Sequence, residues 1–126
     1  MKRNFTLLFL SATMFSFASL VGIDDVIAAL KTGNATQVAK YFDNTVDITL
    51  AEKSNSYSKS QAEVILRDFF ANNPVKSFQI LHSGNNGGSE YCIGKLTTSN
   101  ASYRTTIFMK QKGEKQFLQE IRFENQ

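Results

Sequence analysis

One histidine and one cysteine near the middle of the chain are the side chains with the greatest chemical potential. His82 and Cys92 are the only residues of their types, and Glu90 lies between them. A histidine beside a carboxylate can transfer protons, and a thiol beside a histidine can act as a nucleophile. The strand pairing described below places His82 near Glu90 at the exposed end of a hairpin, which favours a surface pair over a catalytic one. Cys92 falls in an apolar row with Ile80 and Met109, so we expect a buried, unreactive side chain.

Metal, cofactor and nucleic-acid chemistry lack the residues they need. A metal site requires several His, Cys or carboxylate ligands that converge, and one His and one Cys with separate roles do not supply them. No Lys/Arg cluster with interleaved aromatic residues is present after the first 22 residues, so nucleic acid is not an expected partner. We therefore expect no metal and no cofactor.

The first 22 residues have the features of an export signal. Two basic residues precede an apolar run from residue 5 to about residue 17, and small residues follow. This order is typical of a signal peptidase substrate, and the run is shorter than the roughly 20 residues of a membrane-spanning helix. Cleavage after Ala18 and cleavage after Gly22 both fit. The sequence thus predicts a signal peptide over 1–22, a single domain over 23–126, a periplasmic or secreted location, and no membrane anchor after cleavage.

Charge and cysteine content bound the remaining domain. The chain has 14 basic and 11 acidic residues, a net charge of +3. Two of the basic residues and no acidic ones lie in 1–22, which leaves the rest at +1 and gives little attraction for polyanions. A single cysteine cannot form an internal disulfide, so the domain must be stabilised by its apolar core.

Apolar periodicity predicts three helices. The first covers 24–31 and ends at Gly33. The second begins at a capping box at Asn34, and the third at a capping box at Ser58. The third helix must end before Pro74, because the residue before a proline resists helical geometry.

Alternating residues predict the strands. A half-buried strand is expected over 45–51, followed by a polar stretch over 52–57 with at most a short strand around Tyr57. After the third helix, a four-stranded meander is expected at 76–83, 89–99, 102–111 and 115–124. The fold class is therefore α+β, with three helices packed on a curved antiparallel sheet.

The pairing of the meander sorts its side chains into two faces. If Cys92 faces Met109 and Met109 faces Phe117, the more apolar face lies under the helices. It collects Phe78, Ile80, Cys92, Gly94, Leu96, Tyr103, Ile107, Met109, Phe117, Ile121 and Phe123. The opposite face has an apolar centre that could mark a partner surface or be ordinary surface content: Tyr91, Ile93, Phe108 and Leu118.

The order helix, helix, strand, helix and meander resembles the nuclear transport factor 2-like cone, within the cystatin-like group of folds. The likeness is carried by short segments, among them Ile23-Asp24-Asp25-Val26, Lys40-Tyr41-Phe42, Val46-Asp47-Ile48-Thr49, Tyr57-Ser58-Lys59-Ser60-Gln61-Ala62 and Leu96-Thr97-Thr98-Ser99-Asn100. Together they resemble a family of exported bacterial proteins of unknown function, typical of Bacteroidota. The resemblance implies a sheet wrapped around a long third helix and often a homodimer through the outer face of the sheet. It implies no activity.

Enzymes that resemble this fold hold an ionisable side chain inside the cone. The inward row here offers Tyr103, Thr105 and Gln119, with Tyr41 and Tyr57 near the rim, and we take these five as pocket candidates. No Asp or Glu falls on that row. The leading hypothesis is therefore a non-enzymatic binding module for a small apolar ligand or a protein partner. The alternative is a cone-fold enzyme of isomerase or dehydratase type that uses a buried acid–base residue.

Overall fold

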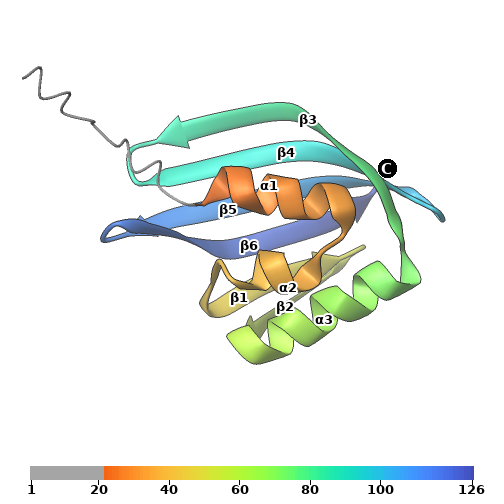
Figure 1. Ribbon diagram of the computed structural model, residues 1–126, viewed down its shortest axis with the longest axis horizontal. Coiled ribbons are helices and arrows are strands. Elements are labelled where there is room, and N and C mark those ends of the chain that lie inside the picture. The colour runs from red at the N-terminus through yellow and green to blue at the C-terminus, as the bar shows by residue number, and fades with distance from the viewer. Residues whose placement is uncertain (1–21) are drawn as a thin grey trace, which may run out of the picture.

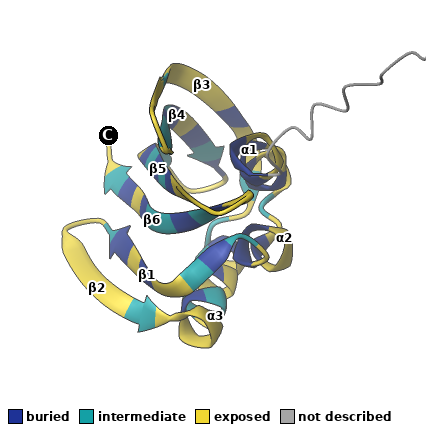
Figure 2. Ribbon diagram, turned by 90° about the vertical axis from the view of Figure 1, so that its left-hand side faces the viewer, coloured by how far each residue is buried: buried dark blue, intermediate teal, exposed yellow. Residues whose placement is uncertain are grey.

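Six strands form one curved sheet, and three helices lie together on its concave face (Figures 1 and 2). The computed structural model of the protein describes residues 22–126. The helices are α1 (Ile23–Thr32), α2 (Ala35–Ala39) and α3 (Lys59–Asn72). The strands are β1 (Phe42–Leu50), β2 (Lys53–Ser58), β3 (Val75–Asn86), β4 (Ser89–Thr98), β5 (Ser102–Lys112) and β6 (Lys115–Asn125). Their order in the sheet is β2-β1-β6-β5-β4-β3.

The helix ends lie where the capping residues predict them. The Asn34 side chain accepts the Gln37 N–H at 3.1 Å, and the Ser58 hydroxyl accepts the Gln61 N–H at 3.3 Å. Gly33 closes α1 in the left-handed conformation, with φ of 66°. These caps satisfy backbone groups that helix ends otherwise leave free, which confirms Asn34 and Ser58 as the N-cap residues.

The sheet differs from the expected antiparallel cone in two ways. It is open, since β2 and β3 are free edges, and it is mixed, since β1 pairs with β6 in parallel. The parallel pair follows from the chain path. The chain leaves β2, returns through α3 and enters β3 in the direction of β2. Three hairpin reversals then bring β6 beside β1 in the same direction.

The two edge strands are longer than predicted. Strand β2 covers Lys53–Ser58, and every residue in it except Tyr57 is exposed. Strand β3 continues to Asn86 and turns through Gly87 and Gly88, where a flexible loop from Ser83 was expected. Strand β2 and the last residues of β3, from Ser83 to Asn86, are solvated on two faces, so they show none of the apolar alternation by which strands are recognised.

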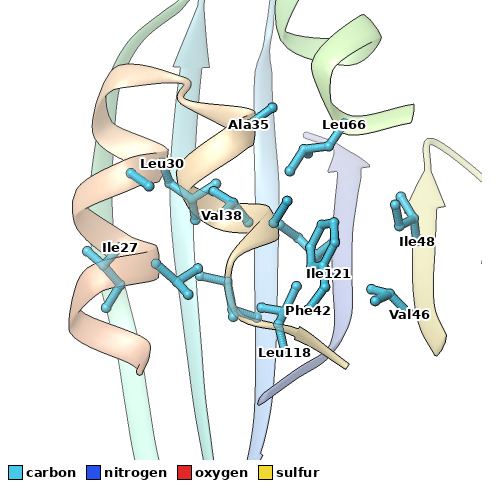
Figure 3. Close-up of a cluster of buried hydrophobic side chains, with 14 of the residues drawn as sticks. Ile27, Leu30, Ala35, Val38, Phe42, Val46, Ile48, Leu66, Leu118 and Ile121 are labelled. Atoms are coloured by element: carbon cyan, nitrogen blue, oxygen red, sulfur yellow. The ribbon is translucent and has the colours of Figure 1, made fainter. Parts of the chain in front are cut away.

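The core lies between the helices and the concave face of the sheet. Figure 3 shows side chains of α1 and α2 meeting Phe42, Leu118 and Ile121 from the sheet. Cys92 and Ile107 are both fully buried there, as the predicted faces require. The Phe78 ring covers Gly94, because a Cβ on Gly94 would overlap that ring, although Phe78 itself pairs with Leu96. Ile80, expected in the same row, is 46% exposed.

A β-bulge corrects the predicted faces of β6. Phe108 pairs with Glu120, but Met109 pairs with Leu118, so Gln119 is an extra residue on β6. Each residue of a strand faces opposite to its neighbours, and one extra residue reverses that alternation. Leu118 therefore points into the core and Phe117 is only half-buried, the reverse of the prediction. Beyond the bulge, Ile121 and Phe123 are fully buried as expected.

The turn between β1 and β2 contains a strained residue. Ala51 has φ of 57°, a left-handed conformation that disfavours any side chain with a Cβ. We expect Ala51→Gly to raise the free energy of unfolding by about 0.5 kcal/mol, the relief of strain less the added freedom of the unfolded chain. Urea denaturation measures this. Ala101→Gly is the control, because Ala101 has no positive φ and its replacement should not stabilise the protein. A gain of equal size in both variants would contradict the strain at Ala51.

Most of the predicted export signal lies outside the described residues, which begin at Gly22. Within residues 22–126, no helix is both long enough and apolar enough to cross a lipid bilayer.

Candidate functional site

His82, Glu90 and Cys92 do not form a reactive group. The Nε2 atom of His82 lies 2.6 Å from the Tyr91 hydroxyl, whereas the Glu90 carboxylate accepts a hydrogen bond of 2.6 Å from the Gln116 amide. The predicted proximity of His82 to Glu90 is thus wrong. Phe78 pairs with Leu96 and His82 pairs with Ile93, so the register of β3 on β4 carries His82 away from Glu90.

Cys92 is enclosed by the core. Its side chain is fully buried, and burial raises the pKa of the thiol. The thiolate is the reactive form of cysteine, so a raised pKa removes it at neutral pH. Within residues 22–126, no three His, Cys, Asp or Glu side chains lie close enough together to hold a metal ion.

Two of the five pocket candidates lie deep in the fold. Thr105 is completely buried on β5, and its hydroxyl reaches the Tyr103 carbonyl at 3.4 Å. Tyr103 is half-buried, and its hydroxyl donates to the Asn73 side chain at 3.0 Å, beyond the end of α3. Both hydroxyl protons are therefore used in contacts within the fold.

The other three candidates lie apart from this pair and from one another. Tyr41 lies in a shallow cleft between α1 and α2, where burial and the nearby Asp25 carboxylate raise the pKa of its phenol. Gln119 donates to Asp43 at 3.1 Å in the β6 bulge. Tyr57 lies on β2, facing α3. The structure thus brings together only Tyr103 and Thr105, and the five do not line one interior pocket.

Aromatic rings fill the space between α3 and β6. The Phe69 ring stacks on Phe123 with centroids 4.4 Å apart, and the Tyr103 ring meets Phe69 edge-on at 5.3 Å. Phe70 meets Phe123 at 6.0 Å. These rings occupy the part of the interior where the sequence predicted a cavity.

An open groove runs between β2 and the first half of α3. Its volume is about 560 Å³. Tyr57, Val64 and Ile65 supply apolar surface, and the other lining residues are polar and uncharged: Asn55, Ser56, Ser60 and Gln61. Val64 is 58% exposed, the largest exposure among the big apolar side chains of the described chain. This groove holds one predicted candidate, Tyr57, and six residues that sequence reasoning missed. Val64 was the available signal, because it is an apolar residue outside the buried stripe of its helix.

The outer, convex face of the sheet carries three of the four predicted dimer-face residues. Tyr91 and Phe108 are direct cross-strand partners, Ile93 follows on β4, and all three are half-buried. Leu118 is 0% exposed and belongs to the core because of the bulge at Gln119, so it is removed from this face. We call Tyr91, Ile93 and Phe108 the convex patch.

A polar cluster fixes the bulge of β6 to the start of β1. One oxygen of Asp43 accepts hydrogen bonds from Lys112 at 2.6 Å and from Gln119 at 3.1 Å. The other accepts the Asn44 N–H at 2.8 Å. The Lys112 contact, aided by those of Asn44 and Gln119 and opposed by burial, lowers the pKa of the Asp43 carboxyl below its usual value.

We expect Asp43→Asn to lower the free energy of unfolding at neutral pH by about 1–2 kcal/mol. The folded-state pKa of Asp43 lies below its unfolded value, so this stabilisation is complete above about pH 5 and is lost as the pH falls through the folded-state pKa. Urea denaturation of the wild type and of Asp43→Asn should therefore give free energies of unfolding whose difference shrinks on acidification. Asp47→Asn is the control, because that exposed carboxylate accepts only a serine hydroxyl. A constant difference across the acid range would refute the assignment.

The likeness to known proteins extends over nearly the whole described chain. Residues 23–124 match the model of a domain of unknown function, DUF4783. The chain belongs to the DUF4783 family. A crystal structure of a DUF4783 protein from Bacteroides uniformis is 33% identical, with a TM-score of 0.79 over 82% of this chain and 95% of that one. A DUF4783 protein from Bacteroides ovatus is 27% identical, with a TM-score of 0.81 over 85% of this chain and 97% of that one. No curated protein matches the chain.

More distant structures share the fold of this DUF4783 protein. A designed NTF2-type protein with a long sheet has a TM-score of 0.63 at 17% identity, over 79% of this chain and 94% of the design. A putative calcium/calmodulin-dependent protein kinase type II association domain from Thiobacillus denitrificans also has a TM-score of 0.63, at 9% identity, over 82% of this chain and 90% of that one. The fold is therefore NTF2-like, as the sequence predicted, in a family without an assigned function.

Proposed function

We propose that the protein is a non-enzymatic binding module, exported to the periplasm or the cell exterior, that holds a small apolar ligand or a protein partner in the groove between β2 and α3. The observation that carries the proposal is the exposed Val64 side chain beside Tyr57 and Ile65, inside a rim of uncharged polar residues. Binding sites typically combine apolar surface with a few polar groups that orient the ligand. The cost of leaving Val64 in water is recovered when a ligand covers it.

The alternative, a cone-fold enzyme of isomerase or dehydratase type, needs an ionisable side chain shielded from water. Cys92 is buried, and burial raises the pKa of its thiol; the other buried residues of 22–126 with polar side chains are Thr49, Thr98, Thr105 and Gln116, none of which transfers protons near neutral pH. The Phe69 and Phe70 rings pack against Phe123 in the interior. These features favour binding at the rim over catalysis in the interior.

Titration with N-phenyl-1-naphthylamine, a neutral apolar dye that fluoresces when shielded from water, tests the proposed groove. We expect saturable binding to the wild-type protein and an affinity about threefold to tenfold lower for Val64→Gln, which exchanges an apolar contact for an amide. Leu81→Gln is the matched control, because Leu81 is 55% exposed on β3, far along the sheet from the groove. Equal loss in both variants, or no saturable binding at all, would rule out the groove as an apolar site.

The convex patch supports a second binding role, as the interface of a homodimer. Its three side chains are half-buried on a sheet face that no helix of the described chain covers. The Thiobacillus denitrificans protein of the same fold is named an association domain, which adds to this proposal. Sedimentation at tens of micromolar tests the dimer, and a clean monomer there would exclude it.

The proposed export also has a structural consequence at Gly22. The Gly22 carbonyl accepts the N–H groups of Asp25 and Val26, and a Cβ at Gly22 would overlap the Gln116 side chain. The first turn of α1 thus depends on the Gly22 carbonyl, and a larger residue at this position would displace the Gln116 side chain. We expect the exported protein to retain Gly22, with cleavage after Ala18 and Ser19 as the first residue. Intact-mass measurement distinguishes this from a chain that begins at Ile23, which would contradict the expectation.

A further inference from the structure

Strand β2 is a free edge with unused backbone groups. A two-residue turn joins it to β1 with Leu50 opposite Lys53, which makes that pair the first hydrogen-bonded one. In an antiparallel pair every second residue is bonded to its partner strand, so the intervening residues present both N–H and C=O to the other side. Ser54 and Ser56 are those residues on β2. Their backbone groups point away from β1 and have no backbone partner elsewhere in residues 22–126.

The opposite edge of the sheet is built differently. The pairing of β3 with β4 contains two register shifts, one between Val75 and Ser77 and one between Ile80 and His82. Such irregularities twist an edge and block the addition of a further strand. The pairing of β2 with β1 runs without a shift from Thr45 to Leu50, and β2 contains neither proline nor glycine. Of the two edges, only β2 has a regular register along its whole length, which is what the addition of another strand requires.

The groove lies on the concave side of this edge. Tyr57 and Asn55 face it, because they pair with the core residues Val46 and Ile48. A strand laid along β2 would direct every second side chain toward Val64 and Ile65 on α3. Apolar side chains at those alternate positions would cover the most exposed large apolar residue of the described chain. Edge and groove therefore specify one occupant, an extended chain with an apolar face.

The charged residues beside β2 favour some extended binding segments over others. Lys53 begins β2 and Lys59 begins α3; of the two acidic residues that flank this segment, Glu63 is paired with Arg67 and Glu52 lies in the turn before β2. Both lysines are exposed. A segment with carboxylates at its two ends would be attracted to them, whereas a second copy of β2 would bring lysines toward lysines. The charges thus favour a different, acidic chain over edge-to-edge self-association.

We propose that an extended segment of another protein, with alternating apolar residues flanked by acidic ones, binds by adding to β2 as a seventh strand. Backbone hydrogen bonds to Ser54 and Ser56 supply affinity independent of sequence, and the contacts with Tyr57, Val64 and Ile65 supply specificity. The inference deepens the proposed function by naming the class of partner, and it rests on that proposal for the use of the groove.

The probe is the synthetic peptide acetyl-Asp-Val-Thr-Val-Thr-Val-Asp-amide, with binding followed by fluorescence anisotropy and by amide chemical shifts of residues 53–66. We expect shifts confined to β2 and α3 and an affinity that falls as salt is added. Ser56→Pro and Val64→Asp should each weaken binding at least tenfold. The proline removes an outward N–H that bonds to nothing in β1, and Val64 is exposed, so both variants should keep the wild-type melting temperature.

Three controls make the test decisive. Leu81→Asp, which places the same charge at an exposed leucine on β3, should bind the peptide as the wild type does. The same peptide N-methylated at its internal amides, and a version with Lys in place of Asp, should both bind at least tenfold more weakly. Full affinity of the N-methylated peptide would overturn strand addition, and so would a peptide-free dimer that Ser56→Pro dissociates. Saturable dye binding without peptide binding would overturn this inference while the proposed function stands.

Discussion

Leu118→Asp is expected to unfold the protein, whereas Phe108→Asp is expected to leave it folded. Leu118 is fully buried among residues of β1, β6 and the helices (Figure 3), so an aspartate there loses the leucine contacts and buries an unpaired charge. The combined cost is on the order of 5 kcal/mol, comparable with the whole stability of a small domain. Circular dichroism during heating should show no cooperative transition for Leu118→Asp.

Phe108→Asp provides both the control and a test of the convex patch. Phe108 is half-buried on the outer face, where a carboxylate reaches water, so we expect a loss of stability of about 1 kcal/mol. If the convex patch joins two copies, sedimentation should show a monomer for Phe108→Asp under conditions where the wild type is a dimer. A folded Leu118→Asp with the wild-type melting temperature would show that the bulge does not turn Leu118 inward.

The bulge explains why the sequence predicted most of the sheet but not this face of it. Strand alternation fixes the faces once one pair of partners is known. The observed pairing of β4 with β5 differs from the predicted one by an even number of residues, so each side chain stays on its predicted face. On β6, Gln119 is inserted between two runs that each alternate correctly. Nothing in its side chain distinguishes it from an outward polar residue. The position of Gln119 in the bulge depends on Asp43, which lies far away in the sequence. The Asp43 carboxylate accepts hydrogen bonds from both Gln119 and Lys112.

Local signals were the most informative for the fold. The capping residues Asn34 and Ser58, the left-handed Gly33 and the stop before Pro74 each act within a few residues, and each lies at a helix end as predicted. Most of strand β2 went unrecognised for the opposite reason. Its residues are polar on both faces because it is an edge, so only its pairing with β1 identifies it as a strand.

The candidate site could be predicted only in part, because its parts meet only in the folded chain. Tyr57 was chosen as a rim residue and does line the groove, but Val64, the exposed apolar residue of α3 beside it, was not among the candidates. Tyr103 and Gln119 carry suitable polar groups, yet each is bonded to another side chain that the sequence does not place beside it. Residue type suggests what a side chain can bind, and only the packing decides whether its polar atoms are free.

Phe123→Ala is expected to be the most destabilising of the substitutions that add no charge. The Phe123 ring is completely buried and lies 4.4 Å from Phe69 and 6.0 Å from Phe70, measured between ring centroids. Removing a phenyl ring from such a site costs about 3–5 kcal/mol, since contacts are lost and a cavity remains. Urea denaturation should show this loss. Phe117→Ala, on the same strand but half-buried, is the matched control and should cost about 1–2 kcal/mol.

The same variant tests whether aromatic rings have closed an interior pocket in this fold. The space left by Phe123 would be lined by Phe69 and Phe70, an apolar surface that water fills poorly. Benzene should therefore raise the melting temperature of Phe123→Ala and leave that of the wild type and Phe117→Ala unchanged, because only the first offers a cavity of its size. An equal change in melting temperature for the wild type, Phe117→Ala and Phe123→Ala would mean that the aromatic rings do not fill the interior. Stabilisation of Phe123→Ala alone would show that the aromatic cluster, rather than the fold, closes an interior pocket in this protein.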